Sequence, residues 1–149
     1  MNTEIIEKLT LKDDKVACAY TDDIVFESQK NNNWYMYFDE FASLLDHPKS
    51  LVRNRTLSIL AANAKWDNEN KFESIIDEYL LHVVDEKPIT SRCCIKKLVE
   101  VGQAKPNLIP IILDKLNNAD LSKYKDSMRQ LIEKDIIDTL EKLKDIRTL

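Results

Sequence analysis

Two adjacent cysteines and two histidines are the residues of this sequence with the widest chemical repertoire. Cys93 and Cys94 could form a metal or redox pair, but adjacent residues on a helix point about 100° apart and cannot easily ligate one ion. His47 and His82 lack partners at the spacing of a known metal signature. We therefore predict that Cys94 packs as a small apolar residue and that both histidines have structural or solvated roles.

The composition gives no motif for catalysis or for cofactor binding. With one glycine, Gly102, the chain has neither a Gly-x-Ser-x-Gly nucleophile turn nor a glycine-rich phosphate loop. Close acidic pairs such as Asp39 and Glu40 are expected by chance among 26 acids, and they are typical of a solvated surface. The sequence therefore predicts a protein that is not an enzyme and that holds no cofactor or metal.

A basic and aromatic cluster is the strongest candidate for a binding surface, because arginine and tryptophan are common anchors in interfaces. Its members are Arg53, Arg55, Asn63, Lys65, Trp66 and Arg92. A structural interpretation stays open beside this one and weighs somewhat more. In it, Arg53 forms an ion pair with Asp46. Arg92 forms one with Asp85 and Trp66 covers the core, so that these residues tie neighbouring helix pairs together.

The aromatic run from Trp34 to Phe38 holds more large side chains than one helix face can bury. We expect Trp34 or Tyr35 to stay partly exposed at the start of a helix. Two roles are open for it, a contact with a partner and a lid packed over the N-terminal helices. We favour the lid, because the N-terminal third, with five lysines and ten acids in residues 1–50, needs apolar contacts to dock.

The elements that position these residues are predicted to be helices throughout. Apolar residues recur at helical spacing, as in the stripe Phe72, Ile75, Ile76, Tyr79, Leu80 and Val83. The pattern predicts eight helices, at roughly 2–10, 13–30, 33–46, 49–65, 70–85, 89–104, 107–117 and 121–144. The stripe of the last helix drifts near Glu133, so a division of that helix into two stays open. The loops are short, so neighbouring helices should pack antiparallel.

The sequence also repeats itself. The pattern apolar-Asp-Glu-aromatic at 38–41 recurs at 76–79, an offset of 38, and Arg53 precedes Arg92 by 39. A period near 40 with two helices in each unit is typical of a helical solenoid. We predict a single domain at 1–149, with N-terminal helices or a cap at 1–32, repeats at 33–66 and 70–105, and a degenerate repeat with the C-terminal helix at 107–144.

Residues 44–53, Leu-Leu-Asp-His-Pro-Lys-Ser-Leu-Val-Arg, resemble the turn between the two helices of a HEAT repeat, with its Asp, its Pro and Val-Arg opening the second helix. Residues 84–92 keep Asp85, Pro88 and Arg92 but have Ser91 in place of the Val. The resemblance implies an all-α, HEAT/ARM-like α-α superhelix of about three to four antiparallel helix pairs. The chain is also similar to short bacterial HEAT-like proteins, some of them labelled SufBD-like.

By analogy with that fold, we predict a scaffold or adaptor that binds a protein or peptide on a concave face lined by the second helices. The alternative is a DNA-binding HEAT-like protein related to alkylation-repair glycosylases, in which Trp66, the three arginines, Lys96 and Lys97 grip DNA. The net charge of −4 argues against nucleic acid, because phosphate neutralisation drives such binding.

A third hypothesis is self-association through an uncapped end near Ile146 and Leu149, so we expect a monomer or a weak oligomer. The start of the sequence has no signal-peptide pattern, and no apolar run reaches 18 residues. Three cysteines, two of them adjacent, do not form a disulfide framework. The sequence therefore predicts a cytoplasmic protein with reduced thiols and no membrane partner.

Overall fold

The computed structural model describes residues 2–148, and these residues form eight α-helices and no strand. The helices are α1 Thr3–Leu9, α2 Asp14–Ser28, α3 Phe38–Ala42, α4 Ser50–Asn63, α5 Lys71–Leu80, α6 Pro88–Ala104, α7 Ile109–Asn117 and α8 Asp126–Thr148. Short 3-10 turns extend four of them, at η1 Tyr35–Tyr37, η2 Ala64–Trp66, η3 Leu81–Val84 and η4 Pro106–Leu108. The all-α prediction and the number of helices are confirmed.

The last helix begins later than predicted, and the division of it that the sequence left open does not occur. It begins at Asp126 rather than near 121, because Tyr124 is buried and its hydroxyl donates to the backbone oxygen of Asp85, which holds the preceding residues in a turn. It is also continuous through Glu133. The apolar stripe drifts there because a core-facing position is occupied by Asp135, which is buried in an ion pair with Arg92.

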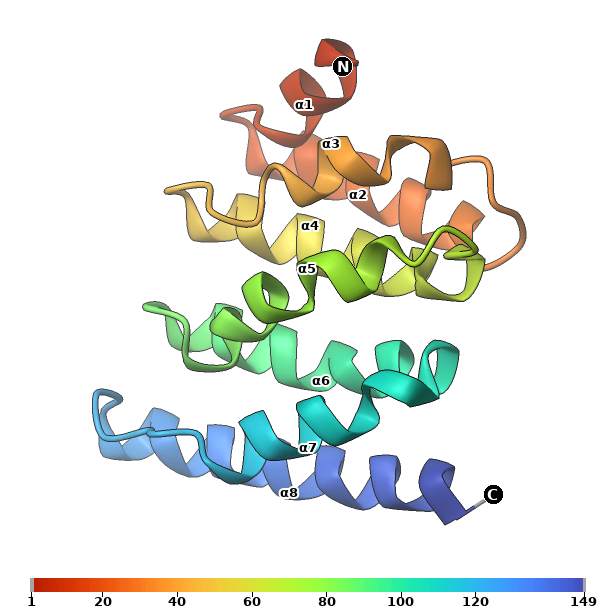
Figure 1. Cartoon of the computed structure of the whole chain (residues 1–149). Coiled ribbons are helices and arrows are strands. Elements are labelled where there is room, and N and C mark those ends of the chain that lie inside the picture. The colour runs from red at the N-terminus through yellow and green to blue at the C-terminus, as the bar shows by residue number, and fades with distance from the viewer. Residues whose placement is uncertain (1, 149) are drawn as a thin grey trace.

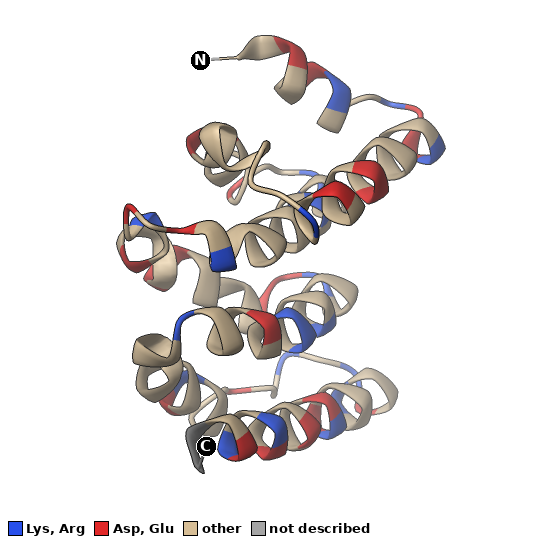
Figure 2. Cartoon of the chain, turned by 90° about the vertical axis from the view of Figure 1, so that its right-hand side faces the viewer, with Lys and Arg blue, Asp and Glu red and all other residues tan. Residues whose placement is uncertain are grey.

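The helices stack in two layers (Figures 1 and 2). The first-helix layer contains α1, α3, α5 and α7, and the second-helix layer contains α2, α4, α6 and α8, each packed against the next. The two termini lie at opposite ends of the stack (Figure 1). We call the edge where each first helix turns into its second helix the turn edge, and the opposite edge, where one pair leads to the next, the connection edge.

Burial of α4 at the centre of the second-helix layer explains its composition. Leu51 is the only exposed residue among those of α4, and the helix has apolar or small side chains on every side. A helix that is apolar all round is expected to be enclosed by other helices. In the first-helix layer, a row of aromatic rings formed by Phe38, Phe72 and Tyr79 joins α3 to α5, with centroids 5.9 and 5.2 Å apart.

The single glycine allows a close approach between helices. A Cβ atom on Gly102 in α6 would lie 2.5 Å from Cδ2 of Leu143 in α8 and 3.3 Å from Cγ1 of Ile109. Any larger residue would have to displace these side chains. Gly102 therefore lets the last helix pair pack directly on the one before it.

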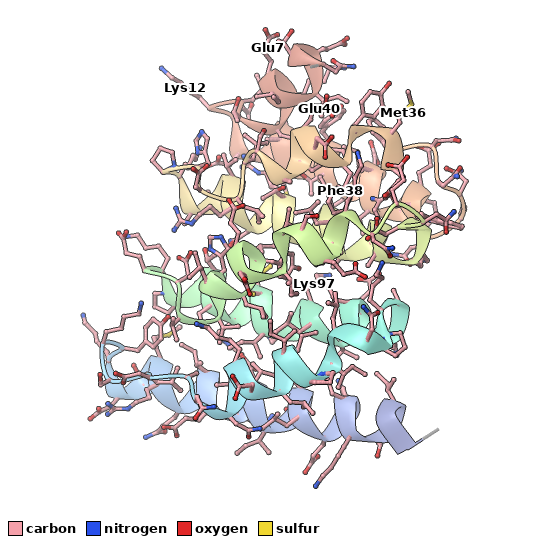
Figure 3. All side chains as sticks on the ribbon, viewed as in Figure 1. Glu7, Lys12, Met36, Phe38, Glu40 and Lys97 are labelled. Atoms are coloured by element: carbon pink, nitrogen blue, oxygen red, sulfur yellow. The ribbon has the colours of Figure 1, made fainter. Side chains whose placement is uncertain are left out.

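The aromatic run forms the predicted lid. Trp34 packs edge-on against Tyr20 of α2, with ring centroids 6.2 Å apart, and its indole N–H donates to Glu27 of the same helix. Trp34 and Tyr35 are partly buried, whereas Met36, 71% exposed, projects away from the stack (Figure 3). Within residues 2–148, no helix combines the length and the apolar character needed to cross a membrane.

Candidate functional site

The six predicted site residues do not form one exposed patch. Arg53, Arg55 and Asn63 are buried, Trp66 and Arg92 are partly buried, and Lys65 is exposed. Each side chain except that of Lys65 is therefore largely enclosed by the protein itself. The structure divides the six into a group at the turn edge and a group at the connection edge.

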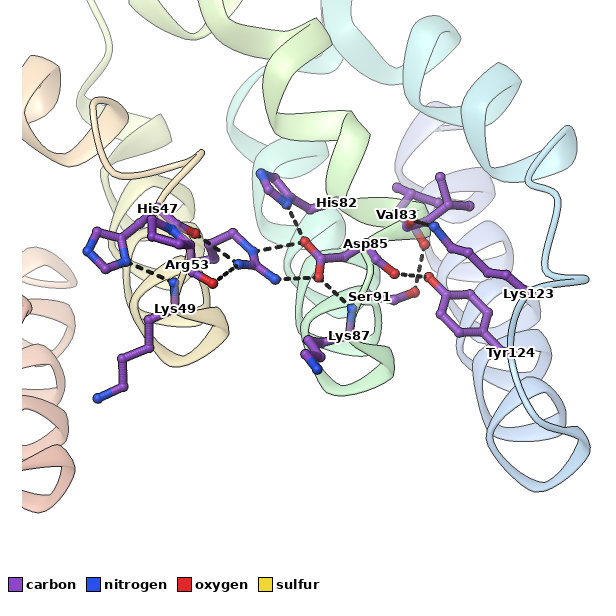
Figure 4. Close-up of polar contacts among 12 residues, drawn as sticks. His47, Lys49, Arg53, His82, Val83, Asp85, Lys87, Ser91, Lys123 and Tyr124 are labelled. Carbon is purple, nitrogen blue, oxygen red and sulfur yellow. Dashed lines mark hydrogen bonds and ion pairs between the residues drawn. The ribbon is translucent and has the colours of Figure 1, made fainter.

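Arg53 joins two helix pairs at the turn edge (Figure 4). Its Nε and Nη2 donate to the two carboxylate oxygens of Asp85 at 3.1 and 2.8 Å, and its Nη1 donates to the backbone oxygens of His47 and Pro48 at 2.8 and 3.0 Å. The guanidinium thus binds the turn of its own pair through carbonyl groups and the turn of the next pair through a carboxylate.

The predicted bridging role of the arginines is confirmed, but the predicted partners are wrong by one pair. Arg53 bonds to Asp85 instead of Asp46, and Arg92 bonds to Asp135 in α8, with Nε 2.6 Å from Oδ2. Asp46 is exposed. The physical reason is that the long arginine side chain at the start of each second helix points toward the following pair, where the acid is buried.

Asp85 is the centre of this network. It also accepts from Nδ1 of His82 at 2.7 Å and from the backbone N–H of Lys87 at 2.8 Å. Burial by itself raises the pKa of Asp85, but hydrogen bonds from His82 and Arg53 outweigh burial and hold the pKa well below its usual value. The carboxylate therefore stays ionised, and the structural role predicted for His82 is confirmed.

At the connection edge, three of the six residues hold the end of α2. The indole N–H of Trp66 donates to the backbone oxygen of Ser28 at 2.7 Å, and Nδ2 of Asn63 donates to the hydroxyl of Ser28 at 3.1 Å. Nζ of Lys65 donates to Oε1 of Gln29 at 2.7 Å. These contacts favour the structural interpretation of the cluster, in which Trp66 covers the core.

Sequence reasoning missed a second buried carboxylate, Asp67. Its oxygens accept from Nζ of Lys105 at 3.1 Å, from the hydroxyl of Tyr35, and from the backbone N–H groups of Lys71 and Phe72 at 2.9 and 2.8 Å. Burial opposes ionisation of Asp67, but these hydrogen bonds outweigh it and lower the pKa. One signal was available, namely that Asp67 stands in a polar turn 38 residues before Lys105, close to one repeat period.

Arg55 lines a hollow between the first turns of α2 and α4. The hollow has a volume of about 400 Å³, and its lining residues are Asp14, Lys15, Cys18, Leu51, Asn54 and Arg55. Arg55 donates to Oδ1 of Asp14 and to the backbone oxygen of Leu9, both at 2.8 Å, and Lys49 donates to the same Asp14 oxygen at 2.6 Å. Hydrogen bonds from Lys49 and Arg55 lower the pKa of Asp14. Two cations therefore share one carboxylate at this hollow.

The two adjacent thiols are enclosed. Cys94 is fully buried and its Sγ lies 3.5 Å from the backbone oxygen of Tyr79, which confirms the predicted packing role. Cys93 lies 3.8 Å from the hydroxyl of Ser58 and from the backbone oxygen of Asn54. Burial raises the pKa of both thiols, so neither is readily converted to the reactive thiolate. Among the described residues, no group of three or more His, Cys, Asp or Glu side chains is placed to hold a metal ion.

A second hollow lies at the C-terminal end of the stack, between α7 and α8. It measures about 390 Å³ and is lined by Leu113, Asn117, Ile137, Leu140, Glu141 and Lys144. Ile146, from the predicted self-association surface, is partly buried against the core, and Leu149 lies outside the described residues.

Comparison of the chain with protein-family models, with curated proteins and with solved structures finds no match.

Proposed function

We propose that the chain is a HEAT-like α-α superhelix that acts as a non-catalytic scaffold and binds a protein or peptide on its second-helix layer. The observation that carries the repeat is the register of bonds between pairs. The arginine bonds span 32 residues for Arg53 and Asp85 and 43 for Arg92 and Asp135. Four other bonds join residues that are 38 or 39 positions apart: Trp66 and Ser28, Lys105 and Asp67, Lys123 and Val84, Tyr124 and Asp85. Such regular contacts between consecutive units are expected of a solenoid.

One contact supports a second-helix layer that curves inward. Nε2 of Gln29, the residue just after α2, donates to Oε2 of Glu100 in α6 at 3.3 Å, although α4 packs between α2 and α6. The end of the α2 segment therefore reaches α6 past α4. The hollow between α2 and α4 adds a concave site with both apolar and charged walls.

Three buried groups are poorly suited to general acid-base catalysis. The pKa of Asp85 is held low, and the pKa values of Cys93 and Cys94 are raised by burial. These directions favour the ionised carboxylate and the neutral thiols, whereas a general acid or base has to exchange a proton near neutral pH.

The DNA-binding alternative draws less support. Arg53 and Arg92 are bonded to carboxylates, and the ring nitrogen of Trp66 is bonded to Ser28. These contacts occupy the residues that would have gripped phosphate or stacked on a base. Among the basic residues assigned to DNA, Lys96 in α6 is exposed.

A peptide selection tests the proposal. Random 12-residue peptides displayed on phage would be selected against the full chain, and the bound peptides would be mapped by amide chemical shifts of the ¹⁵N-labelled protein. We expect micromolar binders whose shifts concentrate in α2, α4 and α6. Shifts confined to α1, α3, α5 and α7, or a selection that returns no binder, would overturn the proposal. A labelled DNA duplex titrated at low salt serves as the control for the alternative.

A further inference from the structure

We infer that the partner is an acidic, extended peptide segment that crosses α2, α4 and α6 near the turn edge and places apolar side chains on Leu51 and Ile89. This inference rests on the proposed function and specifies the chemistry of the partner.

Leu51 and Ile89 occupy equivalent places in consecutive repeats. They are 38 residues apart, each is the second residue of its helix, and they are 41% and 58% exposed. A single exposed apolar residue has no particular meaning, but the same exposure at the same repeat position does. The equivalent position in α8, a further 38 residues on, is the polar residue Ser127, so the apolar row ends at α6.

A contact between α4 and α6 places the first turns of the two helices side by side. Asn54 and Cys93 meet where Sγ of Cys93 lies 3.8 Å from the backbone oxygen of Asn54. Leu51 lies one helical turn before Asn54, and Ile89 lies one turn before Cys93, so their side chains stand on adjacent ridges. Packed helices are about 8–10 Å apart, and three residues of a chain in the polyproline II conformation span about 9 Å, with side chains i and i+3 on the same face. An extended peptide of this kind therefore matches the row with apolar residues at positions i and i+3.

The hollow between α2 and α4 continues this row on the side of α2. Leu51 forms one of its walls, so a peptide that lies on Leu51 has the hollow beside it. Lys15 and the buried Arg55 line the same space. A side chain of the peptide that enters the hollow meets an apolar wall and two cations.

The charges along the row favour an acidic partner. Lys49 and Lys87 are 38 residues apart, and each stands two residues before the apolar residue of its helix. Asp14, the carboxylate at the hollow, is already bonded to both Lys49 and Arg55. Glu86 and the exposed Asp46 offset part of this charge. The row then has the cations Lys15, Lys49, Arg55 and Lys87 against the acids Asp14, Asp46 and Glu86, which leaves one cation in excess. Carboxylates on the peptide would complement that excess.

The test uses the selected phage peptides together with two synthetic peptides. One carries two leucines at i and i+3 among glutamates, and the other replaces the glutamates with lysines. Fluorescence anisotropy with the full chain should give at least tenfold tighter binding of the acidic peptide, and the difference should shrink at high salt. The phage peptides should share its acidic and apolar pattern.

Paired variants locate the site. Leu51→Ser combined with Ile89→Ser should weaken binding of the acidic peptide about tenfold, because two apolar contacts are lost. Leu131→Ser combined with Ile137→Ser, two residues of α8 with 41% and 56% exposure, is the matched control and should change binding less than twofold. Lys15→Gln combined with Lys87→Gln should weaken binding several-fold at low salt.

The outcomes separate this inference from the proposed function. Binders that map to α2, α4 and α6 but are basic, or that ignore the Leu51 and Ile89 variants, would overturn the inference and leave the scaffold proposal standing. Failure of the selection itself would overturn both. Equal loss of affinity in the α8 control would show a nonspecific apolar effect and would also overturn the inference.

Discussion

Asp85 and Asp67 lie at opposite edges of the helix stack, and each joins two consecutive helix pairs. Asp85, at the turn edge, is bonded by the guanidinium fork of Arg53 and by His82. Asp67, at the connection edge, is bonded by Lys105 and Tyr35. Both carboxylates also accept from backbone N–H groups at or just before the start of a helix, so each stabilises a local turn and a contact between helix pairs.

The two carboxylates differ in the bonds that the paired cation would keep if the carboxylate were removed. Lys105 has a second carboxylate, since its Nζ lies 2.9 Å from Oε1 of Glu73, and it also donates to Asn70. Arg53 has the carbonyl groups of His47 and Pro48 but no second carboxylate among its bonds. A buried cation without a counter-ion is costly, so the turn edge should depend on its acid more than the connection edge does.

The largest effect is expected from Asp85→Ala. This change leaves the Arg53 guanidinium, 9% exposed, without its carboxylate, and it removes the acceptor for His82 and for the N–H of Lys87. Removal of one partner from a buried ion pair costs about 3–5 kcal/mol of unfolding free energy. Urea unfolding followed by circular dichroism measures it.

Asp46→Ala provides the control for that experiment. Asp46 is the corresponding acid of the preceding turn and is exposed, so its removal should change the unfolding free energy by less than about 0.5 kcal/mol. Equal losses in the two variants would show that the turn, and not the ion pair between helix pairs, is what stabilises this edge.

Asp67→Ala should have a smaller effect of about 2–3 kcal/mol. The variant loses the two backbone bonds that begin α5 and the bond from Tyr35, but Lys105 keeps Glu73. The same urea measurement applies, with Asp39→Ala as the control, because Asp39 pairs with Lys71 at an exposed position. A loss larger than that of Asp85→Ala would reverse the comparison between the two edges.

The two carboxylates also mark how far sequence reasoning reached. The offset between Arg53 and Arg92 revealed that these residues have equivalent roles, and a bridge to an acid in a turn followed from it. The periodicity could not reveal which turn supplies the acid for each arginine, because residues 46 and 85 are both Asp. The direction of the arginine side chain also depends on how the next helix pair is placed, which the sequence does not show. Asp67 stands about one sequence period before Lys105, but nothing in the pattern marked either residue as buried, so the burial of Asp67 between Tyr35 and Lys105 was not predicted.

Most of the helices were predictable because they have an apolar stripe and a polar loop at each end; α4 is the exception, since it is buried on nearly every side and has no single stripe. The residues that stay exposed on the surface were harder to predict. Leu51 and Ile89 read as ordinary members of apolar helices, and only the structure shows that they stay exposed while Val52 beside Leu51 is buried. Lys49 and Lys87 precede them at the same offset of 38, which is the signal that a search for repeated surface residues would have used.

A more conservative change sharpens the comparison at the turn edge. Arg53→Lys keeps the charge but replaces a planar fork, which bonds both oxygens of Asp85 and two carbonyl groups, with a single ammonium group. We expect a loss of about 1–2 kcal/mol in urea unfolding. Arg129→Lys, at the partly exposed pair with Asp126, is the control and should hardly change the unfolding free energy. Equal losses in the two variants would contradict a stabilising role for the planar fork of Arg53.

Lowering the pH should reduce the unfolding free energy of the wild type more than that of the variant Asp85→Asn. Because the folded pKa of Asp85 lies well below its unfolded value near 4, its ionised form stabilises the protein above about pH 4. That stabilisation falls as the pH drops from about 4 toward the folded pKa, by roughly 1 kcal/mol at pH 3. Urea unfolding at pH 6 and pH 3 should therefore show the gap between wild type and Asp85→Asn narrowing. A constant gap would mean that Arg53 and His82 do not favour the ionised carboxylate, and that Asp85 and Asp67 differ in geometry alone.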